Sequence, residues 1–367
     1  MNIAFLGIRG VPARYSGFET AAEEVGRRLV ERGHAVTVYC RGRDEHSEWM
    51  GMRLVHLPTL RLKVTDTLAH TALSMLHLQR RPPDVAVIFN AANAPLLPLA
   101  RARRVPVALH VDGLEWKRAK WGPMGKRYYR AAERLAVRWA DALIADARGI
   151  EEYYRQTFGA PSSFIPYGAP ILADPRTDRL AELDLLPRRY HLVVARFEPE
   201  NNVETMVRGY LASASSLPLA VVGSAPYSAR YTERIRDLAA SDARVRLLGG
   251  VWDQDLLNAL YANAYCYLHG HSVGGTNPTL LRAMGAGAPV LAFDVVFNRE
   301  VLADTGRFFA GPDALARLVD EEEADSDACR QRGLRGRDRA AALYDWDAVT
   351  DGYEALCERL AKVARRR

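Results

Sequence analysis

The sequence has few cysteines, and none of them is spaced as a metal ligand or as half of a redox pair. Its four cysteines are far apart in the chain and form no CxxC motif: Cys40, Cys266, Cys329 and Cys357. This spacing excludes the common zinc-binding patterns and predicts no disulfide framework. We therefore expect four free thiols in a reducing cytoplasm and no metal site.

The sequence also lacks a long hydrophobic run, a signal peptide and a large charge of one sign. No stretch reaches the roughly 18 apolar residues of a membrane-spanning helix, and the N-terminal MNIAFLG has no basic segment before its apolar run. The 50 Lys and Arg exceed the 44 Asp and Glu by six charges. That excess suits a phosphate-bearing ligand or anionic lipid and does not predict nucleic-acid binding. We expect a cytoplasmic protein, or one peripheral on the cytoplasmic face of the membrane.

Short apolar, β-branched runs alternate with helical patterns from one end of the chain to the other, and each run predicts a strand. There are twelve of them: 3–7, 35–39, 53–56, 85–89, 107–110, 142–145, 163–165, 190–194, 219–222, 245–248, 264–268 and 290–292. Continuous apolar strands separated by helices are typical of parallel sheets that helices cover on both faces. The sequence therefore predicts an α/β fold with doubly wound, Rossmann-like sheets.

Length and proline content divide this pattern in two. The chain of 367 residues is too long for one ordinary core, and residues 166–189 hold four prolines and no clear strand before the pattern restarts at Tyr190. We predict an N-terminal domain over 1–170, a C-terminal domain over 171–345, and a terminal helix over 346–367 that packs back on the N-terminal domain. The expected architecture is two Rossmann-like domains facing each other across a cleft, with ligands at the carboxyl ends of the strands.

The loop after the first predicted strand, GIRGVPARYSGFET, has no GxGxxG or P-loop motif, although it leads from a strand to a helix. Gly10 would still let the backbone approach a ligand closely. Three polar side chains that are costly to place without partners follow it: Arg14, Tyr15 and Glu19. A long loop without a ligand is the alternative interpretation.

The loop HVDGLEWKRAKW follows another predicted strand and holds a second group of polar residues. His110 and Asp112 lie on the same side of an extended segment, and Glu115 adds a second carboxylate. These groups suit acid/base chemistry or the binding of a hydroxyl. A structural His–Asp pair is the alternative.

Residues 115–130, EWKRAKWGPMGKRYYR, hold six Lys or Arg with two Trp and two Tyr interleaved. Aromatic rings beside cations are typical of a protein surface that rests on anionic lipid. The competing interpretation is a solvated helix face with the Trp side chains in the core.

Two loops of the C-terminal half suit a diphosphate. Arg196 and Asn201 stand in VARFEPENN, at the end of the first strand of this half, where a guanidinium can bind phosphate. The second loop, HGHSVGGTNPTLLR, precedes a helix, whose N-terminus and glycine-rich approach favour an anion. Its candidate residues are His271, Gly274, Gly275, Thr276, Asn277 and Arg282.

These two loops, followed by AMGAGAPVLAFD, resemble the donor half of retaining glycosyltransferases of the GT-B fold, in glycosyltransferase family 4. Together with RGVPARYSGFET and VDGLEWKRAKW, they make nearly the whole chain similar to a branch that contains rhamnosyltransferases of bacterial capsule and cell-wall polysaccharide assembly. The resemblance implies transfer of a hexose or deoxyhexose, with dTDP-L-rhamnose as the expected donor, to a hydroxyl of a lipid-linked or growing saccharide. It implies no cofactor and no metal.

The resemblance also implies roles for the candidate residues. Arg196 and the amides of 274–277 would stabilise the leaving diphosphate, and His271 and Asn277 would contact the sugar or its phosphates. Asp112 would lie nearest the acceptor hydroxyl, assisted by His110 and Glu115. Further contacts are expected to the donor from Gly10, Asn201 and Arg282, and to the acceptor from Arg14, Tyr15 and Glu19. Retention would follow from front-face attack, with the departing phosphate oxygen as base.

The chain departs from the family pattern at three positions. The family's two glutamates, eight positions apart, are replaced by Gly274 and Arg282, and Asn201 stands where a basic residue is common. The second glutamate would bind the nucleotide ribose, and a deoxyribose nucleotide has less need of it. Two other functions remain open: a further enzyme on the same scaffold, such as a nucleotide-sugar epimerase or a phosphorylase, and a non-catalytic sugar-nucleotide-binding protein.

Overall fold

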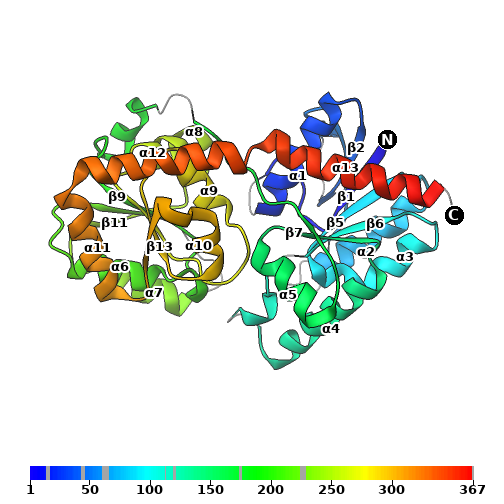
Figure 1. Ribbon diagram of the computed structural model, residues 1–367, viewed down its shortest axis with the longest axis horizontal. Coiled ribbons are helices and arrows are strands. Elements are labelled where there is room, and N and C mark those ends of the chain that lie inside the picture. The colour runs from blue at the N-terminus through cyan, green and yellow to red at the C-terminus, as the bar shows by residue number, and fades with distance from the viewer. Residues whose placement is uncertain are drawn as a thin grey trace. The chain divides into compact units, whose positions relative to one another are not determined.

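The computed structural model describes residues 1–13, 17–42, 46–59, 66–111, 113–118, 121–172, 176–223 and 229–365. The chain divides into two compact units (Figure 1): residues 1–167 with 346–367 form unit 1, and residues 168–345 form unit 2. Each unit is a parallel or mostly parallel sheet with helices packed against it, so the α/β class predicted from the sequence is confirmed. Among the described residues, no helix combines the length and hydropathy needed to cross a membrane.

The sheet of unit 1 has eight strands in the order β3-β4-β2-β1-β5-β6-β7-β8, and all its pairings are parallel except that of β3 with β4. The strands are β1 (Asn2–Leu6), β2 (Ala35–Arg41), β3 (Glu48–Trp49), β4 (Met52–Leu57), β5 (Val85–Phe89), β6 (Val107–Val111), β7 (Ala142–Ala145) and β8 (Ser163–Phe164). Strands β5 and β6 are buried along their whole length, as expected for strands with helices on both faces.

The helices of unit 1 follow the strands in alternation. They are α1 (Gly17–Glu31), α2 (Asp66–Leu78), η1 (Ala91–Leu96), α3 (Leu97–Arg101), η2 (Glu115–Lys117), α4 (Pro123–Trp139), α5 (Arg148–Phe158) and α13 (Trp346–Arg365). Helix α1 has Glu19 in its first turn and Arg28 in its last, which complements the helix dipole, and Gly33 follows its end with a φ of +86°.

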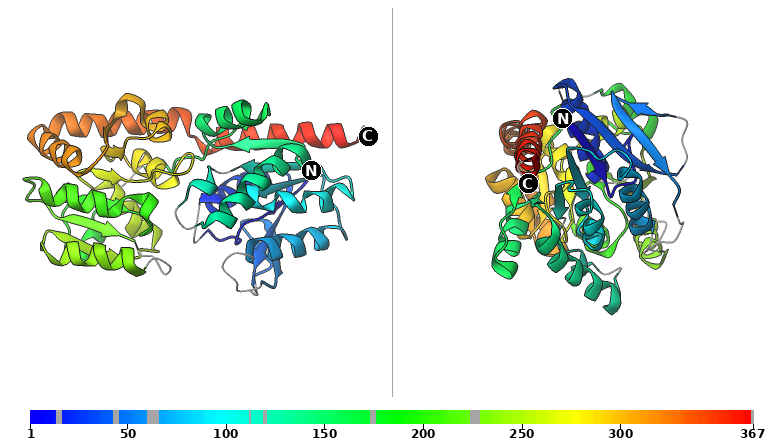
Figure 2. Two further views of the ribbon diagram at one scale, coloured as in Figure 1. Left: turned by 90° about the horizontal axis from the view of Figure 1, so that it is seen from below. Right: turned by 90° about the vertical axis from the view of Figure 1, so that its right-hand side faces the viewer.

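Helix α13, the last of the chain, packs against α1 of unit 1, and both termini lie in this unit (Figure 2). Arg28 Nε lies 2.9 Å from Asp347, and Arg32 Nη1 lies 2.7 Å from Asp351 and 2.6 Å from Glu354. Buried apolar side chains of α13 lie beneath these ion pairs, among them Val349, Tyr353, Leu356 and Leu360. The last helix is therefore a structural part of unit 1.

The sheet of unit 2 has six parallel strands in the order β11-β10-β9-β12-β13-β14. They are β9 (His191–Val194), β10 (Leu219–Val222), β11 (Val245–Gly249), β12 (Tyr267–His269), β13 (Val290–Phe293) and β14 (Gly306–Phe309). The helical elements are η3 (Asp178–Leu183), η4 (Pro199–Asn201), α6 (Val203–Ala212), α7 (Ala229–Ala240), α8 (Gln254–Ala262), α9 (Pro278–Gly285), α10 (Val296–Leu302), η5 (Ala303–Thr305), α11 (Pro312–Ala324) and α12 (Ser326–Leu343).

Each sheet has one point at which its strand order reverses. In unit 1 the chain proceeds from β1 to β2 on one side, and β5 then pairs on the other side of β1. In unit 2, β10 and β11 extend one side of β9, and β12 then pairs on its other side. Ligands of open parallel sheets bind at the carboxyl ends of the strands at such points. The expected ligand sites are therefore the ends of β1 and β5 and the ends of β9 and β12.

Candidate functional site

The two candidate loops of unit 2 meet at the reversal point of its sheet. The loop after β9 runs from Arg196 to Asn202, and the side-chain amide of Asn202 donates a hydrogen bond to the carbonyl of Gly270, after β12, at 2.8 Å. In return, the backbone N–H and the hydroxyl of Ser272 donate to the carbonyl of Glu200, at 2.9 and 2.8 Å. Hydrogen bonds in both directions thus join the loops that the sequence placed in separate motifs.

Gly270 permits this close approach of the two loops. A Cβ atom at this position would lie 2.2 Å from the backbone oxygen of Asn201 and 2.8 Å from the Cε of Met206. Asn201 is itself buried, and its side-chain amide donates to the carbonyl of Arg196 at 2.8 Å. The predicted donor residue Asn201 therefore shapes the loop, whereas the Arg196 side chain is exposed at the strand end.

Asn277 caps helix α9. Its side-chain oxygen accepts hydrogen bonds from the Thr279 N–H at 3.0 Å and from the Thr279 hydroxyl at 2.7 Å. Its backbone carbonyl accepts from the N–H of Leu280 and of Leu281, each at 3.1 Å, and Pro278 has no N–H to offer. Since the first-turn N–H groups are engaged, an anion at this helix would be met by the 274–277 loop amides and by the helix dipole.

Two imidazoles and a phenol lie beside this loop. The rings of His269 and His271 stack with centroids 4.7 Å apart. Tyr267 Oη lies 3.2 Å from His269 Nδ1 and donates to the Thr279 hydroxyl at 3.0 Å. Burial lowers the pKa of His269 to about 3, so this imidazole is neutral at physiological pH. The carbonyl of His271 accepts a hydrogen bond from the Asn298 side chain at 3.0 Å.

Arg282 lies on α9 and contacts the start of α8. Its Nη2 donates to the side-chain oxygen of Gln254 at 2.8 Å. Gln254 in turn donates to the backbone carbonyl of Trp252 at 3.1 Å. Arg282 therefore belongs to the same edge of unit 2 as the loops that end β11 and β12.

In unit 1, glycines again allow loops to converge at the reversal point. A Cβ on Gly7 would lie 2.3 Å from the carbonyl oxygen of Phe89, and Gly10 has a φ of +130° with the Cys40 Sγ 2.7 Å from an added Cβ. Glu19 is buried, and its carboxylate accepts the N–H of Arg9 at 2.9 Å. Glu19 therefore holds the loop that precedes its own helix.

His110 is buried among aromatic rings near the carboxyl end of β6. The rings of Phe18, Phe89 and Tyr167 have centroids 5.2, 5.6 and 5.9 Å from that of His110. Desolvation lowers the pKa of His110 to about 3. A neutral imidazole of this kind suits hydrogen bonding to a hydroxyl and is a weak proton acceptor at neutral pH.

Three predicted residues of unit 1, Arg14, Tyr15 and Asp112, lie outside the described residues. Glu115 is buried, pairs with Arg118 Nε at 2.5 Å and accepts a hydrogen bond from the Trp121 indole at 3.0 Å. Its carboxylate thus holds the segment after β6 in place.

Several residues that shape these edges were not among the candidates of the sequence analysis, although some lie inside the quoted motifs. They are Asn90, Asn93, Asn202, Tyr267, Gly270, Ser272, Thr279 and Asn298. Asn90 and Asn202 have positive φ angles of 76° and 50°, which asparagine tolerates better than most residues. An asparagine directly after a predicted strand was the one clue that could have drawn attention to Asn90.

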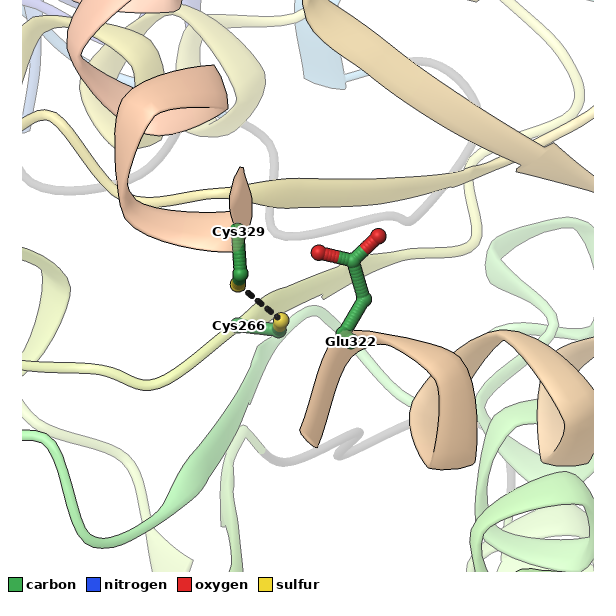
Figure 3. Close-up of side chains that lie close together, drawn as sticks. All are labelled: Cys266, Glu322 and Cys329. Atoms are coloured by element: carbon green, nitrogen blue, oxygen red, sulfur yellow. Dashed lines mark hydrogen bonds between the residues drawn. The ribbon is translucent and has the colours of Figure 1, made fainter. Parts of the chain in front are cut away.

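A cluster of two cysteines and a glutamate lies elsewhere in unit 2, where Cys266, Cys329 and Glu322 point toward one another (Figure 3). The sulfurs are 3.6 Å apart, and all four cysteines of the chain are free and buried. The Glu322 carboxylate, however, accepts two hydrogen bonds from Arg332 Nη2, at 2.6 and 2.7 Å, and lies 3.2 Å from Arg307 Nη1. This carboxylate pairs with two guanidinium groups and joins α11 to β14 and α12. Its negative charge is therefore balanced by arginine without a metal ion.

Comparisons with known proteins agree with this architecture. Residues 16–168 match the family described as "Glycosyl transferase 4-like domain", and residues 181–339 match "Glycosyl transferases group 1". Over 277 residues the chain is 26% identical to an alpha-maltose-1-phosphate synthase of Mycolicibacterium smegmatis, covering 67% of this chain and 71% of that protein. A 126-residue stretch is 28% identical to the GtfA subunit of a Streptococcus gordonii UDP-N-acetylglucosamine–peptide N-acetylglucosaminyltransferase, covering 33% of this chain and 24% of that protein.

Solved structures share the fold of the whole chain. Sucrose-phosphate synthase of Thermosynechococcus elongatus superposes with a TM-score of 0.84 at 21% identity, covering 99% of each chain. HepE of Anabaena, in its complex with UDP-glucose, superposes with a TM-score of 0.77 at 16% identity, covering 98% of this chain and all of the other. The two family matches together take in most of the sequence. The chain therefore belongs to the glycosyltransferases of the GT-B fold, with a glycosyl transferase 4-like domain followed by a group 1 domain.

Proposed function

We propose that the chain transfers a sugar from a nucleoside diphosphate sugar to a hydroxyl of a lipid-linked or growing saccharide, in the assembly of a cell-surface polysaccharide. The observation that carries the proposal is the paired loop structure at the end of β9 and β12, where Arg196 and the 274–277 loop lie on one edge. L-Rhamnose from dTDP-L-rhamnose is the donor that the motifs of the chain favour. The solved complexes of HepE with UDP and with UDP-glucose make a UDP-hexose the second candidate.

The diphosphate is bound by charge and by amides in this proposal. Arg196 is an exposed residue whose guanidinium carries several N–H donors, and the glycines of the 274–277 loop let backbone amides approach a phosphate. The dipole of α9 adds positive potential at its N-terminus. Such groups stabilise the charge that develops on the departing phosphate oxygen, which is the part that a divalent cation plays in other transferases.

The reaction breaks the bond between the anomeric carbon and the phosphate oxygen and forms a bond from that carbon to the acceptor oxygen on the same face. The departing phosphate oxygen takes the acceptor proton, so no strongly basic side chain is required. This suits the low pKa of His110, which serves as a neutral hydrogen-bond partner and not as the base. Asp112 is assigned to the acceptor hydroxyl, as the motif implies.

The acceptor is assigned to the ends of β1, β5 and β6 in unit 1. Glu19 accepts the N–H of Arg9, which precedes Arg14 and Tyr15 by five and six residues in the sequence. Phe18 and Tyr167 flank His110, and aromatic rings are good surfaces for the apolar face of a sugar. Glu115 supports this region through Arg118 and Trp121.

A lipid-linked acceptor requires contact with a membrane, for which helix α4 is the proposed surface. Its exposed side carries Met124 and the cations Lys126, Arg127, Arg130, Arg134 and Arg138. Within the described part of the chain, Glu133 is the one carboxylate on α4, and it is buried with Tyr153 donating to it at 2.9 Å. A cationic helix face with an exposed methionine suits anionic headgroups.

The test is a transfer assay with radiolabelled dTDP-L-rhamnose or UDP-glucose, membranes containing lipid-linked saccharide, and excess EDTA. We expect label to pass into the lipid fraction and nucleoside diphosphate to be released, both undiminished by EDTA. Arg196→Ala should lower the rate by about 100-fold, as for loss of one oxyanion donor, while exposed Arg330→Ala on α12 should leave it unchanged. Failure of every donor to bind or react would refute the proposal. Interconversion of the sugar nucleotide without acceptor would favour an epimerase.

A further inference from the structure

A buried phenol connects the end of β9 to the loop that precedes α9. Tyr267 is fully buried, and its Oη donates to the Thr279 hydroxyl at 3.0 Å and lies 3.3 Å from the carbonyl oxygen of Val194. The same Oη lies 3.2 Å from Nδ1 of His269, an imidazole that is also fully buried. The Thr279 hydroxyl in turn donates to Asn277 Oδ1 at 2.7 Å. These four side chains, from His269 through Tyr267 and Thr279 to Asn277, form the Tyr267 network.

The hydrogens of the Tyr267 network determine the tautomer of His269. Asn277 Oδ1 is an acceptor, because it also takes the Thr279 N–H at 3.0 Å, so the Thr279 hydroxyl hydrogen points to it. Thr279 Oγ1 then accepts the hydrogen of Tyr267, whose Oη is left to accept from His269. Burial lowers the pKa of His269 to about 3, so its neutral ring carries a single N–H at physiological pH. All the contacts are satisfied when that hydrogen is on Nδ1.

The other tautomer, with the hydrogen on Nε2, fits the surroundings less well. His269 Nε2 is buried, and the side chain of Asn298 faces it without reaching hydrogen-bond geometry. The amide nitrogen of Asn298 donates instead to the carbonyls of His271 and Phe293, at 3.0 and 2.8 Å. An Nε2–H would also leave one contact of the Tyr267 network without a hydrogen, so that two lone pairs would face each other.

The network ends at Asn277 and fixes the orientation of its carboxamide. Oδ1 accepts both the N–H and the hydroxyl of Thr279, in the first turn of α9. The two hydrogens of Asn277 Nδ2 have no hydrogen-bond partner among the residues that the structure describes. A carboxamide turned the other way would present its oxygen, which repels a phosphate, in place of its NH₂ group.

We propose that Tyr267 and His269 are positioning residues for the donor: through Thr279 they hold the Asn277 carboxamide so that its NH₂ group binds the diphosphate. This inference rests on the proposed donor site at the 274–277 loop. Both rings are fully buried, so they act on the donor through Thr279 and Asn277 alone. Without the Tyr267 hydroxyl, Thr279 loses its donor, and its own hydroxyl can turn to a backbone carbonyl of the preceding turn.

NMR of the full chain with isotope-labelled imidazole nitrogens tests the hydrogen-bond direction without any ligand. The signal of His269 is identified among the nine histidines by its loss in His269→Asn. We expect the wild type to carry the hydrogen on Nδ1 at neutral pH. Tyr267→Phe removes the acceptor of that hydrogen and should move it to Nε2.

Calorimetric titration with dTDP and with UDP tests the positioning role. Tyr267→Phe should weaken nucleotide binding by about tenfold, as for the loss of one hydrogen bond. The control is Tyr190→Phe, which removes another fully buried phenol of unit 2, whose hydroxyl donates to the Leu260 carbonyl at 2.7 Å before β9 begins. It should lower the melting temperature and leave nucleotide affinity and the His269 tautomer unchanged. Thr279→Ser, which keeps a hydroxyl, should retain most of the affinity that Thr279→Val loses.

The outcomes separate the inference from the proposed function. If wild-type His269 carries its hydrogen on Nε2, or Tyr267→Phe leaves the tautomer unchanged, the direction assigned to the Tyr267 network is wrong. If the wild type binds either nucleotide and Tyr267→Phe binds it as Tyr190→Phe does, the positioning role is wrong while the donor site stands. If the wild type binds neither nucleotide, the proposed function fails and the positioning role fails with it.

Discussion

Asn277 caps helix α9, and we propose that it also lies beside the diphosphate of the donor; two substitutions separate these roles. Asn277→Ala removes the side-chain acceptor of the Thr279 N–H and should destabilise unit 2 by about 1 kcal/mol, as for loss of a helix cap. Asn277→Asp keeps the acceptor and should preserve stability, but its negative charge beside a diphosphate should weaken binding of dTDP at least tenfold. Chemical denaturation and calorimetry measure the two effects. Unchanged dTDP affinity in Asn277→Asp would show that the diphosphate binds elsewhere.

The lowered pKa of His110 predicts that the free energy of unfolding depends on pH. Its pKa is about 3 in the folded chain and near the ordinary 6.5 when unfolded, so below pH 6.5 the unfolded state binds a proton that the folded state excludes. Stability should therefore fall with falling pH, by about 2 kcal/mol between pH 7.5 and 5 for this residue alone. His110→Phe, which retains a ring among the aromatic neighbours, should lose that part of the decline. Equal pH slopes for the two proteins in thermal melts would contradict the assignment.

At the residue scale, the sequence predicted local backbone conformation better than it predicted the hydrogen-bond partners of individual side chains. Gly10 and Gly274 have the positive φ angles that their loops require, and Asn277 directly precedes helix α9, as predicted. Glu19, Glu115 and Asn201 were predicted as ligand contacts, and each has a hydrogen-bond partner within its own segment. A motif shows that a polar residue is needed, but it does not show whether its partner is a ligand or a group of its own loop.

A substitution at Gly270 tests whether the loops after β9 and β12 depend on each other for their structure. Gly270→Ala would push a methyl group against the Asn201 carbonyl and should separate the loops after β9 and β12. We expect a loss of about 1–3 kcal/mol in stability, as for overpacking, together with weaker dTDP binding. The control is Gly311→Ala, because an added Cβ there meets no atom within 4 Å. A Gly270→Ala protein that melts and binds dTDP like Gly311→Ala would refute the coupling of the loops.

At the element scale, all twelve predicted strands are found to within a few residues, because buried parallel strands are written as continuous apolar runs. The strands β3 and β14 were missed. Strand β3 has two residues, too few for a pattern, and β14 reads GRFF, with an arginine that lies 3.2 Å from Glu322. Each of these strands is defined by its pairing with a neighbouring strand, β3 with β4 and β14 with β13. The sequence of one segment alone does not reveal such a pairing.

At the scale of the whole molecule, unit 1 is built from both ends of the chain, because helix α13 belongs to it. Leu356 of α13 is buried to 1% exposure, whereas Val363 on the same helix is 46% exposed. Leu356→Ala should therefore destabilise unit 1 by about 2–5 kcal/mol, and Val363→Ala should change its stability by less than about 0.5 kcal/mol. Denaturation followed by tryptophan fluorescence and circular dichroism measures both. If the two variants unfold alike, α13 does not contribute to the core of unit 1.

At the scale of the whole molecule, the donor is proposed to bind at one edge of unit 2, where β9, β11 and β12 end. Hydrogen–deuterium exchange of the full chain, with and without saturating dTDP, tests this assignment most directly. We expect slower exchange in the loop 196–202, in 270–282 and in the loop after β11, and unchanged exchange in α12, on which Arg330 lies. Protection confined to unit 1, or an absence of protection in 196–202 and 270–282 while dTDP is bound, would contradict the account.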